Sequence, residues 1–260
     1  MNDLHVSLIQ SDLYWEQPEA NLAMFEEKIW DLEDTDLIVL PEMFTTGFSM
    51  EPQKLAEPHG GRVFKWMRQM ASQKNAAVTG SCIIKDGANC FNRLYFVYPD
   101  GSSKQYDKKH LFAMAGEGED FTAGNEKIIV EYKGWKICPL ICYDLRFPVW
   151  ARSKKSDSAL YEYDLLIYVA NWPEPRVHAW DTLLKARGIE NLSYCIGVNR
   201  VGEDGYGKNY VGHSGAYTYN GEELAFSEFE ESLSFKLSSQ NLKEFREKFP
   251  FQQDADAFSL

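Results

Sequence analysis

The stretch WKICPLICYDLRFP, residues 135–148, changes abruptly from apolar to polar at a cysteine. Its first eight residues, Trp135 to Cys142, hold one charged side chain, which is typical of a central strand covered on both faces. Beyond Cys142 the pattern becomes polar, and Pro148 prevents regular strand pairing from continuing. The sequence therefore predicts a buried strand with Cys142 at its end, a position where α/β enzymes expose reactive side chains.

Length and composition limit the class of protein. With 260 residues, 44% of them hydrophobic, the chain can bury one large α/β core, and we expect residues 1–260 to form a single domain. The 27 basic and 39 acidic residues give a net charge of −12. Such a charge disfavours nucleic acid and anionic membranes as partners, because both repel an acidic surface.

The beginning of the chain and the cysteines indicate where the protein works. The start, MNDLHVSLIQSD, lacks the basic and apolar regions of a signal peptide, and no segment has the roughly 18 to 20 apolar residues of a membrane span. We therefore expect a cytoplasmic protein. Five cysteines without a secretory signal predict reduced thiols, and no Cys or His spacing predicts a metal site.

Hydrophobic periodicity outlines two similar halves. The order strand, helix, buried strand, helix, strand, strand occurs in residues 4–98 and again, with a shorter first helix, in residues 135–219. We therefore predict an α/β fold in which two helix-covered sheets stack into a four-layer α-β-β-α sandwich, followed by a C-terminal helix and tail over residues 239–260. The predicted strands cover residues 4–10, 36–42, 76–84, 92–98, 135–142, 164–171 and 195–201, with a hairpin of residues 214–219 and 222–226; the predicted helices cover residues 18–32, 62–74, 177–192 and 242–248.

Two further reactive side chains follow strand-like runs. Glu42 comes directly after the aliphatic run of DLIVLPE, although a single acid at such a place is usually a solvated loop residue. If the chain stays extended from Lys104, then Tyr106, Lys108 and His110 lie on one face. A carboxylate, an ammonium and a thiol can together perform nucleophilic catalysis, so Glu42, Lys108 and Cys142 form the candidate constellation.

These three motifs resemble a known family. DLIVLPEMF around Glu42, YDKKHLF around Lys108 and CYDLRFP around Cys142 match, in order and spacing, the signatures of the nitrilase superfamily of carbon-nitrogen hydrolases. The resemblance extends from Leu4 to Glu230. Further segments look like its omega-amidase branch, which hydrolyses the side-chain amide of 2-oxo acids such as 2-oxoglutaramate and 2-oxosuccinamate; these segments are PEMFTTGFSM, KKHLFAMAGE, CYDLRFPVWAR, NRVG and KFPFQQDADAF.

The resemblance implies a nitrilase-type sandwich and a role for each residue. Cys142 would be the nucleophile, Glu42 the general base and acid, and Lys108 the ligand of the oxyanion. Superfamily members also carry a second glutamate that orients the lysine; Glu117 is our choice, and Glu119 remains an alternative. The resemblance implies no cofactor and a homodimer formed through the face near the nucleophile.

The substrate of an omega-amidase carries a carboxylate, which requires a cation. Arg146 could bind it through two hydrogen bonds, and Arg176 is the second choice, although Arg146 could equally pair with Asp144. The backbone N–H of Tyr143 would assist the oxyanion. Aromatic residues that follow the motif strands could line the pocket: Phe44, Phe48 and Trp172.

Other interpretations of the sequence remain open. A papain-like pair would use His110 or His178 as the base, but the cysteine's context does not resemble that family. A nitrile or N-carbamoyl amine hydrolase would share the same three catalytic residues. A non-catalytic binding protein is the alternative from another class, in which Cys142 would be no more reactive than the other four cysteines.

Overall fold

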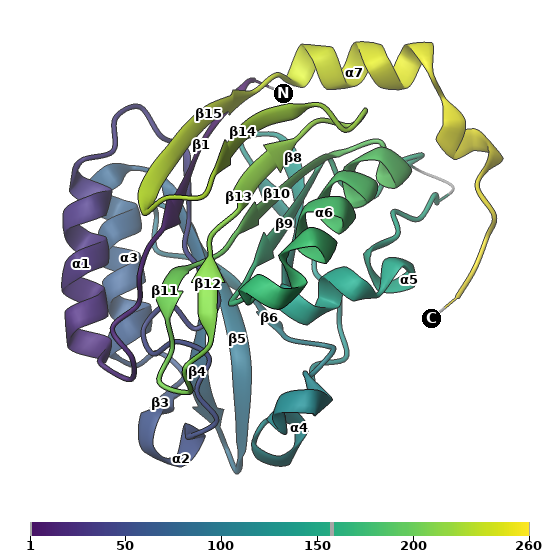
Figure 1. Ribbon diagram of the computed structural model, residues 1–260. Coiled ribbons are helices and arrows are strands. Elements are labelled where there is room, and N and C mark those ends of the chain that lie inside the picture. The colour runs from purple at the N-terminus through teal and green to yellow at the C-terminus, as the bar shows by residue number, and fades with distance from the viewer. Residues whose placement is uncertain (1, 157–158, 260) are drawn as a thin grey trace.

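The computed structural model describes residues 2–156 and 159–259, and this part of the chain contains two large β-sheets (Figure 1). The first sheet has the strand order β15-β1-β2-β4-β5-β6, with β3 beside β4, and the second has the order β14-β13-β10-β9-β8-β7. The strands of the first sheet are β1 (Leu4–Gln10), β2 (Leu37–Val39), β3 (Glu57–Pro58), β4 (Ala77–Asp86), β5 (Asn89–Val97), β6 (Ser103–Asp107) and β15 (Glu231–Leu237). Those of the second are β7 (Val130–Tyr132), β8 (Trp135–Ile141), β9 (Leu165–Val169), β10 (Tyr194–Val198), β13 (Ser214–Tyr217) and β14 (Glu223–Ser227).

The two sheets repeat one topology. β1, β2 and β4 are parallel neighbours, and β5 then adds antiparallel to β4. In the second sheet β8, β9 and β10 are parallel neighbours, and β13 adds antiparallel to β10. The two halves predicted from the sequence are therefore confirmed, including the hairpin of β13 and β14.

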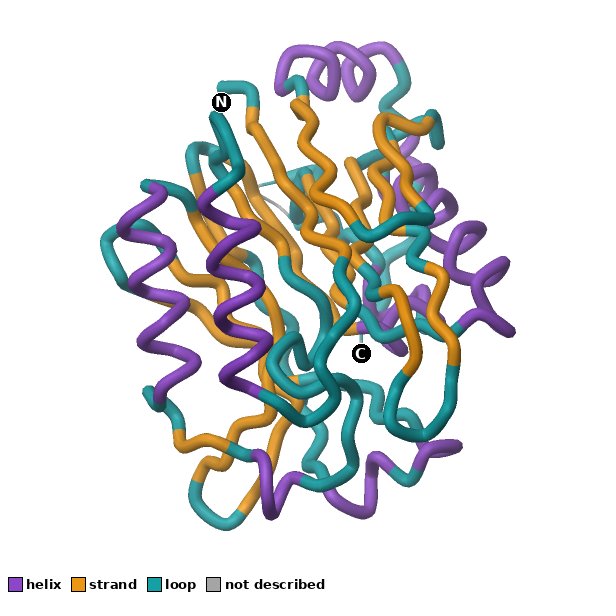
Figure 2. The backbone as a smooth tube through the Cα atoms, turned by 60° about the vertical axis from the view of Figure 1, so that its left-hand side comes forward, coloured by secondary structure: helices purple, strands orange, loops and turns teal. Residues whose placement is uncertain are grey.

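Helices cover the outer faces of the two sheets and complete the predicted α-β-β-α sandwich. α1 (Pro18–Trp30) and α3 (Arg62–Lys74) lie on the first sheet, and α6 (Val177–Asn191) lies on the second (Figures 1 and 2). Four shorter helices are α2 (Pro52–Leu55), α4 (Glu117–Asp120), α5 (Pro148–Ala151) and α7 (Ser239–Lys248). No helix in the described ranges has the length and apolarity needed to cross a membrane.

The buried strand β2 shows why its sequence is continuously aliphatic. Leu37 and Val39 belong to the core cluster shared with the second sheet, whereas Ile38 points to the other side, into the cluster with α1 and α3. All three side chains are fully buried. Because both faces of the strand are covered, a run without polar alternation is stabilised there. The Trp66 and Met67 side chains of α3 lie in the same cluster as Ile38, so they are core residues, as the helical periodicity predicts.

Some element boundaries differ from the predicted ones. The extended segment expected to reach His110 ends at Asp107; the Lys108 N–H still donates to the Asn92 carbonyl of β5 at 3.0 Å, and the donors after it leave the strand ladder. The Lys109 N–H donates to the Tyr106 hydroxyl, and the His110 N–H donates to the Asp144 carboxylate. Strand β15 is absent from the predicted elements, yet it pairs with the whole of β1 in antiparallel register.

The C-terminal segment packs on the body of the same chain. α7 begins after Ser238, whose hydroxyl accepts a hydrogen bond from the Asn241 N–H, so the helix starts earlier than the predicted residue 242. Farther on, the side chain of Gln252 donates to the Ser153 carbonyl at 2.7 Å and accepts from Arg152 at 3.0 Å. The tail is therefore tied to the segment that follows α5.

Candidate active site

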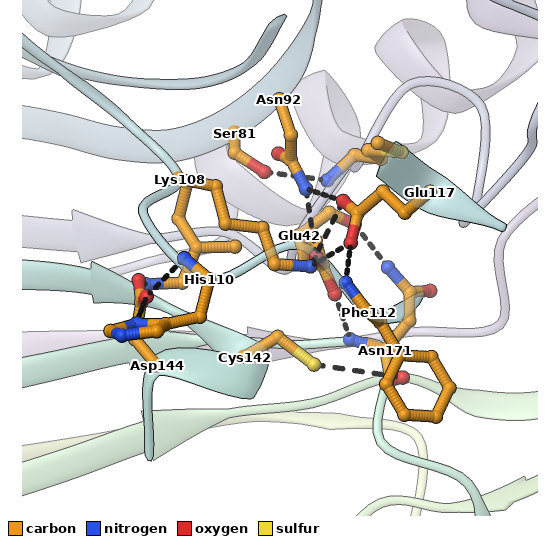
Figure 3. Close-up of polar contacts among 12 residues, drawn as sticks. Glu42, Ser81, Asn92, Lys108, His110, Phe112, Glu117, Cys142, Asp144 and Asn171 are labelled. Atoms are coloured by element: carbon orange, nitrogen blue, oxygen red, sulfur yellow. Dashed lines mark hydrogen bonds and ion pairs between the residues drawn. The ribbon is translucent and has the colours of Figure 1, made fainter. Parts of the chain in front are cut away.

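The three predicted reactive residues lie together where strand ends of the two sheets meet. Glu42 follows β2, Lys108 follows β6, and Cys142 follows β8 (Figure 3). The Lys108 ammonium donates to Glu42 Oε1 at 2.8 Å. Both side chains are almost completely buried, with 1% and 0% of their surfaces exposed. A buried ion pair is stable only when the attraction between its charges and additional hydrogen bonds offset the loss of hydration.

Glu117 completes the charged cluster. Lys108 Nζ lies 3.0 Å from Glu117 Oε1 and 2.9 Å from Oε2, and the Phe112 N–H donates to Oε2 at 2.6 Å. Glu117 is fully buried in the short helix α4, whereas Glu119 of the same helix is exposed. The structure thus places Glu117, and not Glu119, against the lysine.

The cluster carries two carboxylates for one ammonium. Burial lowers the pKa of Lys108, but the nearby Glu117 and Glu42 carboxylates outweigh it and raise that pKa overall. Burial raises the pKa of Glu117, and its neighbour Glu42 adds to this effect while Lys108 opposes it. The ammonium is therefore held in its charged form, as a ligand for an oxyanion must be.

Cys142 occupies a sharp turn at the end of β8. Its φ of 42° lies in the left-handed region, which costs a non-glycine residue about 1 to 3 kcal/mol and persists only where neighbouring contacts enforce it. The residue begins a 3-10 turn that covers Cys142–Arg146. This geometry lifts the thiol out of the strand and toward the Glu42 and Lys108 cluster (Figure 3).

The buried carboxylate of Asp144 enforces this turn. It accepts hydrogen bonds from the Ile141 N–H at 3.0 Å and from the Tyr106 hydroxyl at 2.7 Å. Its other oxygen accepts from the His110 N–H at 3.0 Å and contacts His110 Nδ1 at 2.8 Å. Four contacts on one carboxylate thus fix the segment after β6 to the turn that carries Cys142.

The surroundings of Cys142 favour the neutral thiol. Burial raises its pKa well above the usual value, the Glu42 carboxylate raises it further, and Lys108 opposes both effects. Its Sγ lies 3.9 Å from the Asn171 carbonyl oxygen. Since a thiol must lose its proton to attack a carbonyl carbon, the site requires a base, and Glu42 is the adjacent carboxylate.

Two asparagines that sequence reasoning missed hold Glu42 in place. Asn92 Nδ2 donates to Glu42 Oε1 at 2.8 Å and lies 3.4 Å from Glu117 Oε1. The Asn171 N–H donates to Glu42 Oε2 at 2.9 Å, and its side chain donates to the Glu42 carbonyl at 2.6 Å. Both asparagines lie in or directly after predicted strands, but a single sequence contains no signal that distinguishes them from other buried polar residues.

A pocket opens beside Cys142, and most of the predicted substrate-binding residues line it. Phe44 does not, because it packs in the core against Phe25 and Trp66. His110 is not among the lining residues, and His178 is exposed on α6, so the papain-like alternative has no imidazole at the thiol. The lining residues are Phe48, Lys108, Phe112, Cys142, Tyr143, Arg146, Asn171, Trp172, Pro173, Arg176, Lys208 and Tyr210.

The two predicted arginines face aromatic rings. The Arg146 guanidinium lies 4.9 Å from the ring centre of Trp172, and that of Arg176 lies 5.0 Å from the ring centre of Phe112. The Asp144 carboxylate is engaged elsewhere, and neither arginine forms a salt bridge with a carboxylate in the described ranges. Stacking on an aromatic face leaves the guanidinium edge available for a bound anion.

Fold and sequence together define a class of protein: a hydrolase with an α-β-β-α fold that acts on carbon-nitrogen bonds. Residues 5–246 match the family model of carbon-nitrogen hydrolases, and the chain belongs to this family. No group of three or more His, Cys, Asp and Glu side chains in the described part of the chain is arranged to hold a metal ion.

Proteins with similar sequences indicate which kind of carbon-nitrogen hydrolase this is. The chain is 45% identical to "Omega-amidase YafV" of Escherichia coli (strain K12) over 264 residues, which span 100% of both proteins. It is 32% identical to "2-oxoglutaramate amidase" of Bacillus subtilis over 256 residues, 96% of each. The crystal structure of a CN-hydrolase superfamily protein from Xanthomonas campestris, with an arsenic adduct in its active site, matches with a TM-score of 0.98 and 40% identity over 100% of both chains. The enzyme is therefore an amidase of this family.

Proposed function

We propose that the protein is an omega-amidase that releases ammonia from the side-chain amide of 2-oxo acids, with 2-oxoglutaramate and 2-oxosuccinamate as candidate substrates. The observation that carries this proposal is the charge of the pocket, whose lining includes four basic side chains and no acidic one among the described residues. Lys108 is paired with Glu42 and Glu117, so the remaining cations are available for a substrate carboxylate. The names of the relatives from Escherichia coli and Bacillus subtilis support the same substrate class.

The first half of the reaction forms a thioester. Glu42 removes the proton from Cys142, and Sγ attacks the amide carbon. The developing oxyanion binds the Lys108 ammonium and the backbone N–H of Tyr143. Glu42 then gives its proton to the departing nitrogen, and ammonia leaves.

The second half regenerates the thiol. Glu42 takes a proton from water, which attacks the thioester carbon, and the tetrahedral intermediate again places its oxyanion on Lys108. Collapse of that intermediate breaks the carbon-sulfur bond, releases the dicarboxylic 2-oxo acid and returns the proton to Cys142. Glu117 acts as a positioning residue, because it holds the ammonium from the side opposite the reaction. These steps require no cofactor.

The substrate carboxylate is assigned to Arg146, with Arg176 as the second candidate. Phe48 and Trp172 form apolar walls, and the Phe48 ring centre lies 5.0 Å from Lys108 Nζ. A pocket lined by the thiol, by arginines and by aromatic side chains suits a short amide that carries a carboxylate.

Substrate comparison tests this proposal. Ammonia release is measured from 2-oxoglutaramate, glutamine, a simple nitrile and an N-carbamoyl amino acid, with wild type and Arg146→Gln. We expect turnover of 2-oxoglutaramate and a rise of KM for charged amides alone in the variant. Preferred release from the nitrile, or of carbon dioxide together with ammonia from the carbamoyl compound, would replace the proposal by the corresponding hydrolase.

We also propose that residues 1–260 form a single domain of this family, that the protein is cytoplasmic and that it forms a homodimer. The face beside the nucleophile turn supports the dimer, because Val149 is 53% exposed there next to Phe147 and Pro148. Light scattering coupled to size-exclusion chromatography measures the molar mass directly. A mass equal to that of one chain at micromolar concentration would contradict the dimer.

A further inference from the structure

A lysine that sequence reasoning did not select reaches the active-site pocket from a separate small sheet. Lys208 lies between β11 (Val201–Glu203) and β12 (Asn209–Val211), which form a two-stranded sheet with one further bridge from Val201 to Asp12, and it lines the same pocket as Cys142. Figure 1 shows this hairpin near the centre of the view, between the labels of α1 and α6. A role for Lys208 rests on the proposed function, since it concerns the carboxylate of the amide substrate.

The turn that carries Lys208 is fixed by one buried carboxylate. Asp204 Oδ1 accepts hydrogen bonds from the Tyr206 N–H at 2.9 Å and the Lys208 N–H at 3.0 Å. Its Oδ2 accepts from the Tyr210 hydroxyl at 2.8 Å. Because Tyr210 also lines the pocket, Asp204 positions two lining residues at once. The hairpin is thus preorganised and does not depend on ligand for its shape.

The base of the hairpin is anchored to the first half of the chain. The buried Arg200 donates to Asp12 Oδ1 at 2.8 Å and to the Glu203 carbonyl at 3.0 Å. At the tip, the rings of Tyr206 and Trp15 lie edge to face with centres 5.0 Å apart. These contacts at its base and tip hold the hairpin, and with it the backbone of Lys208, beside the pocket.

The charge of Lys208 has no carboxylate partner in the described ranges. Its Nζ lies 5.8 Å from the ring centre of Tyr206. Arg146 and Arg176 of the same pocket also lack salt bridges. Three unpaired cations from three chain segments therefore surround a pocket without acidic lining, which is how a site for an anion is built.

We propose that Lys208 is a specificity-determining residue that binds the carboxylate of the substrate together with Arg146. The β11–β12 hairpin supplies this cation from a part of the chain remote from the nucleophile turn. The ligand class is a short carboxylate that carries an amide at its other end. A neutral amide of the same length gains nothing from Lys208.

Protection of the thiol measures this contact without any turnover. Cys142 is alkylated with iodoacetamide while glutarate, a dicarboxylate without an amide to cleave, is titrated as a protecting ligand. The proteins are wild type, Lys208→Met, Lys208→Arg and, as matched control, Lys243→Met, whose lysine is 68% exposed on α7. Losing one charge-assisted contact predicts about a tenfold higher half-protecting glutarate concentration in Lys208→Met. Lys208→Arg and Lys243→Met should remain near wild type.

The outcomes separate the role of Lys208 from the proposed function. Equal half-protecting glutarate concentrations in Lys208→Met and wild type would overturn the role of Lys208, as would a complete lack of protection in wild type. Failure of wild type to hydrolyse 2-oxoglutaramate would instead contradict the proposed function, and the protection experiment would still measure carboxylate binding.

Discussion

Replacing Glu117 by glutamine tests whether this buried acid positions the Lys108 ammonium for the proposed reaction. Each of its two oxygens faces hydrogen-bond donors: Oε1 accepts from Lys108 and Asn92, and Oε2 accepts from Lys108 and the Phe112 N–H. In Glu117→Gln, one end of the side chain becomes an NH2 group, which must face one of these donors in either orientation. The variant therefore loses a charge-assisted hydrogen bond however its amide is turned.

Such a bond contributes about 1.5 to 3 kcal/mol, and if it acts fully in the transition state kcat falls about 10- to 150-fold. The assay is ammonia release under saturating 2-oxoglutaramate, with urea unfolding to show that the variant is folded. Glu119→Gln is the matched control: its carboxylate is exposed on the same helix, and both kcat and stability should stay near wild type. Wild-type kcat in Glu117→Gln, or an equal loss in Glu119→Gln, would refute the reasoning.

Three further predictions concern Cys142, Asp144 and Asn92, which surround the Glu42, Lys108 and Glu117 cluster. Burial and the Glu42 carboxylate raise the pKa of Cys142. Glu42→Gln should therefore move the pH profile of Cys142 alkylation by iodoacetamide to lower pH. An unmoved profile would show that the Glu42 carboxylate does not raise this pKa. Asp144→Ala leaves the donors at the turn of residues 142–146 without an acceptor. It should lower the free energy of unfolding, measured by urea titration, by about 3 kcal/mol or more. A loss under about 1 kcal/mol would show that the carboxylate does not hold the turn. Asn92→Ala removes the side-chain amide that donates to Glu42 Oε1 at 2.8 Å. The variant should have a kcat about tenfold lower and an unchanged KM. A rise in KM alone would assign Asn92 to substrate binding.

The parts of the fold that the sequence predicts well are those with two-sided burial. The aliphatic run of β2 and the run ending at Cys142 need covering on both faces, so they indicate central parallel strands. The amino-acid pattern alone therefore places Glu42 and Cys142 each at the end of a buried strand, whereas their meeting depends on how the two sheets stack, because β2 and β8 belong to different sheets. The Lys108 position agrees with the predicted one as well, although the strand that precedes it is shorter than expected.

Other parts of the site depend on contacts that local sequence does not encode. α4 has four residues, too few for a hydrophobic period, so the buried acid of this helix is identified by its contacts with Lys108 and with the Phe112 N–H. The strands beside Lys208 have three residues each, and their position depends on a buried arginine and on Asp204. Single-sequence patterns cannot predict such long-range polar contacts.

The central claim is that Cys142 forms a thioester with the substrate's acyl group. The most direct measurement is mass spectrometry of acid-quenched enzyme mixed with 2-oxoglutaramate, with Cys142→Ala as the parallel sample. The account predicts the acyl adduct on the peptide that contains residues 135–148 in wild type, and neither adduct nor ammonia in the variant. An adduct on another residue, or continued ammonia release by Cys142→Ala, would contradict it.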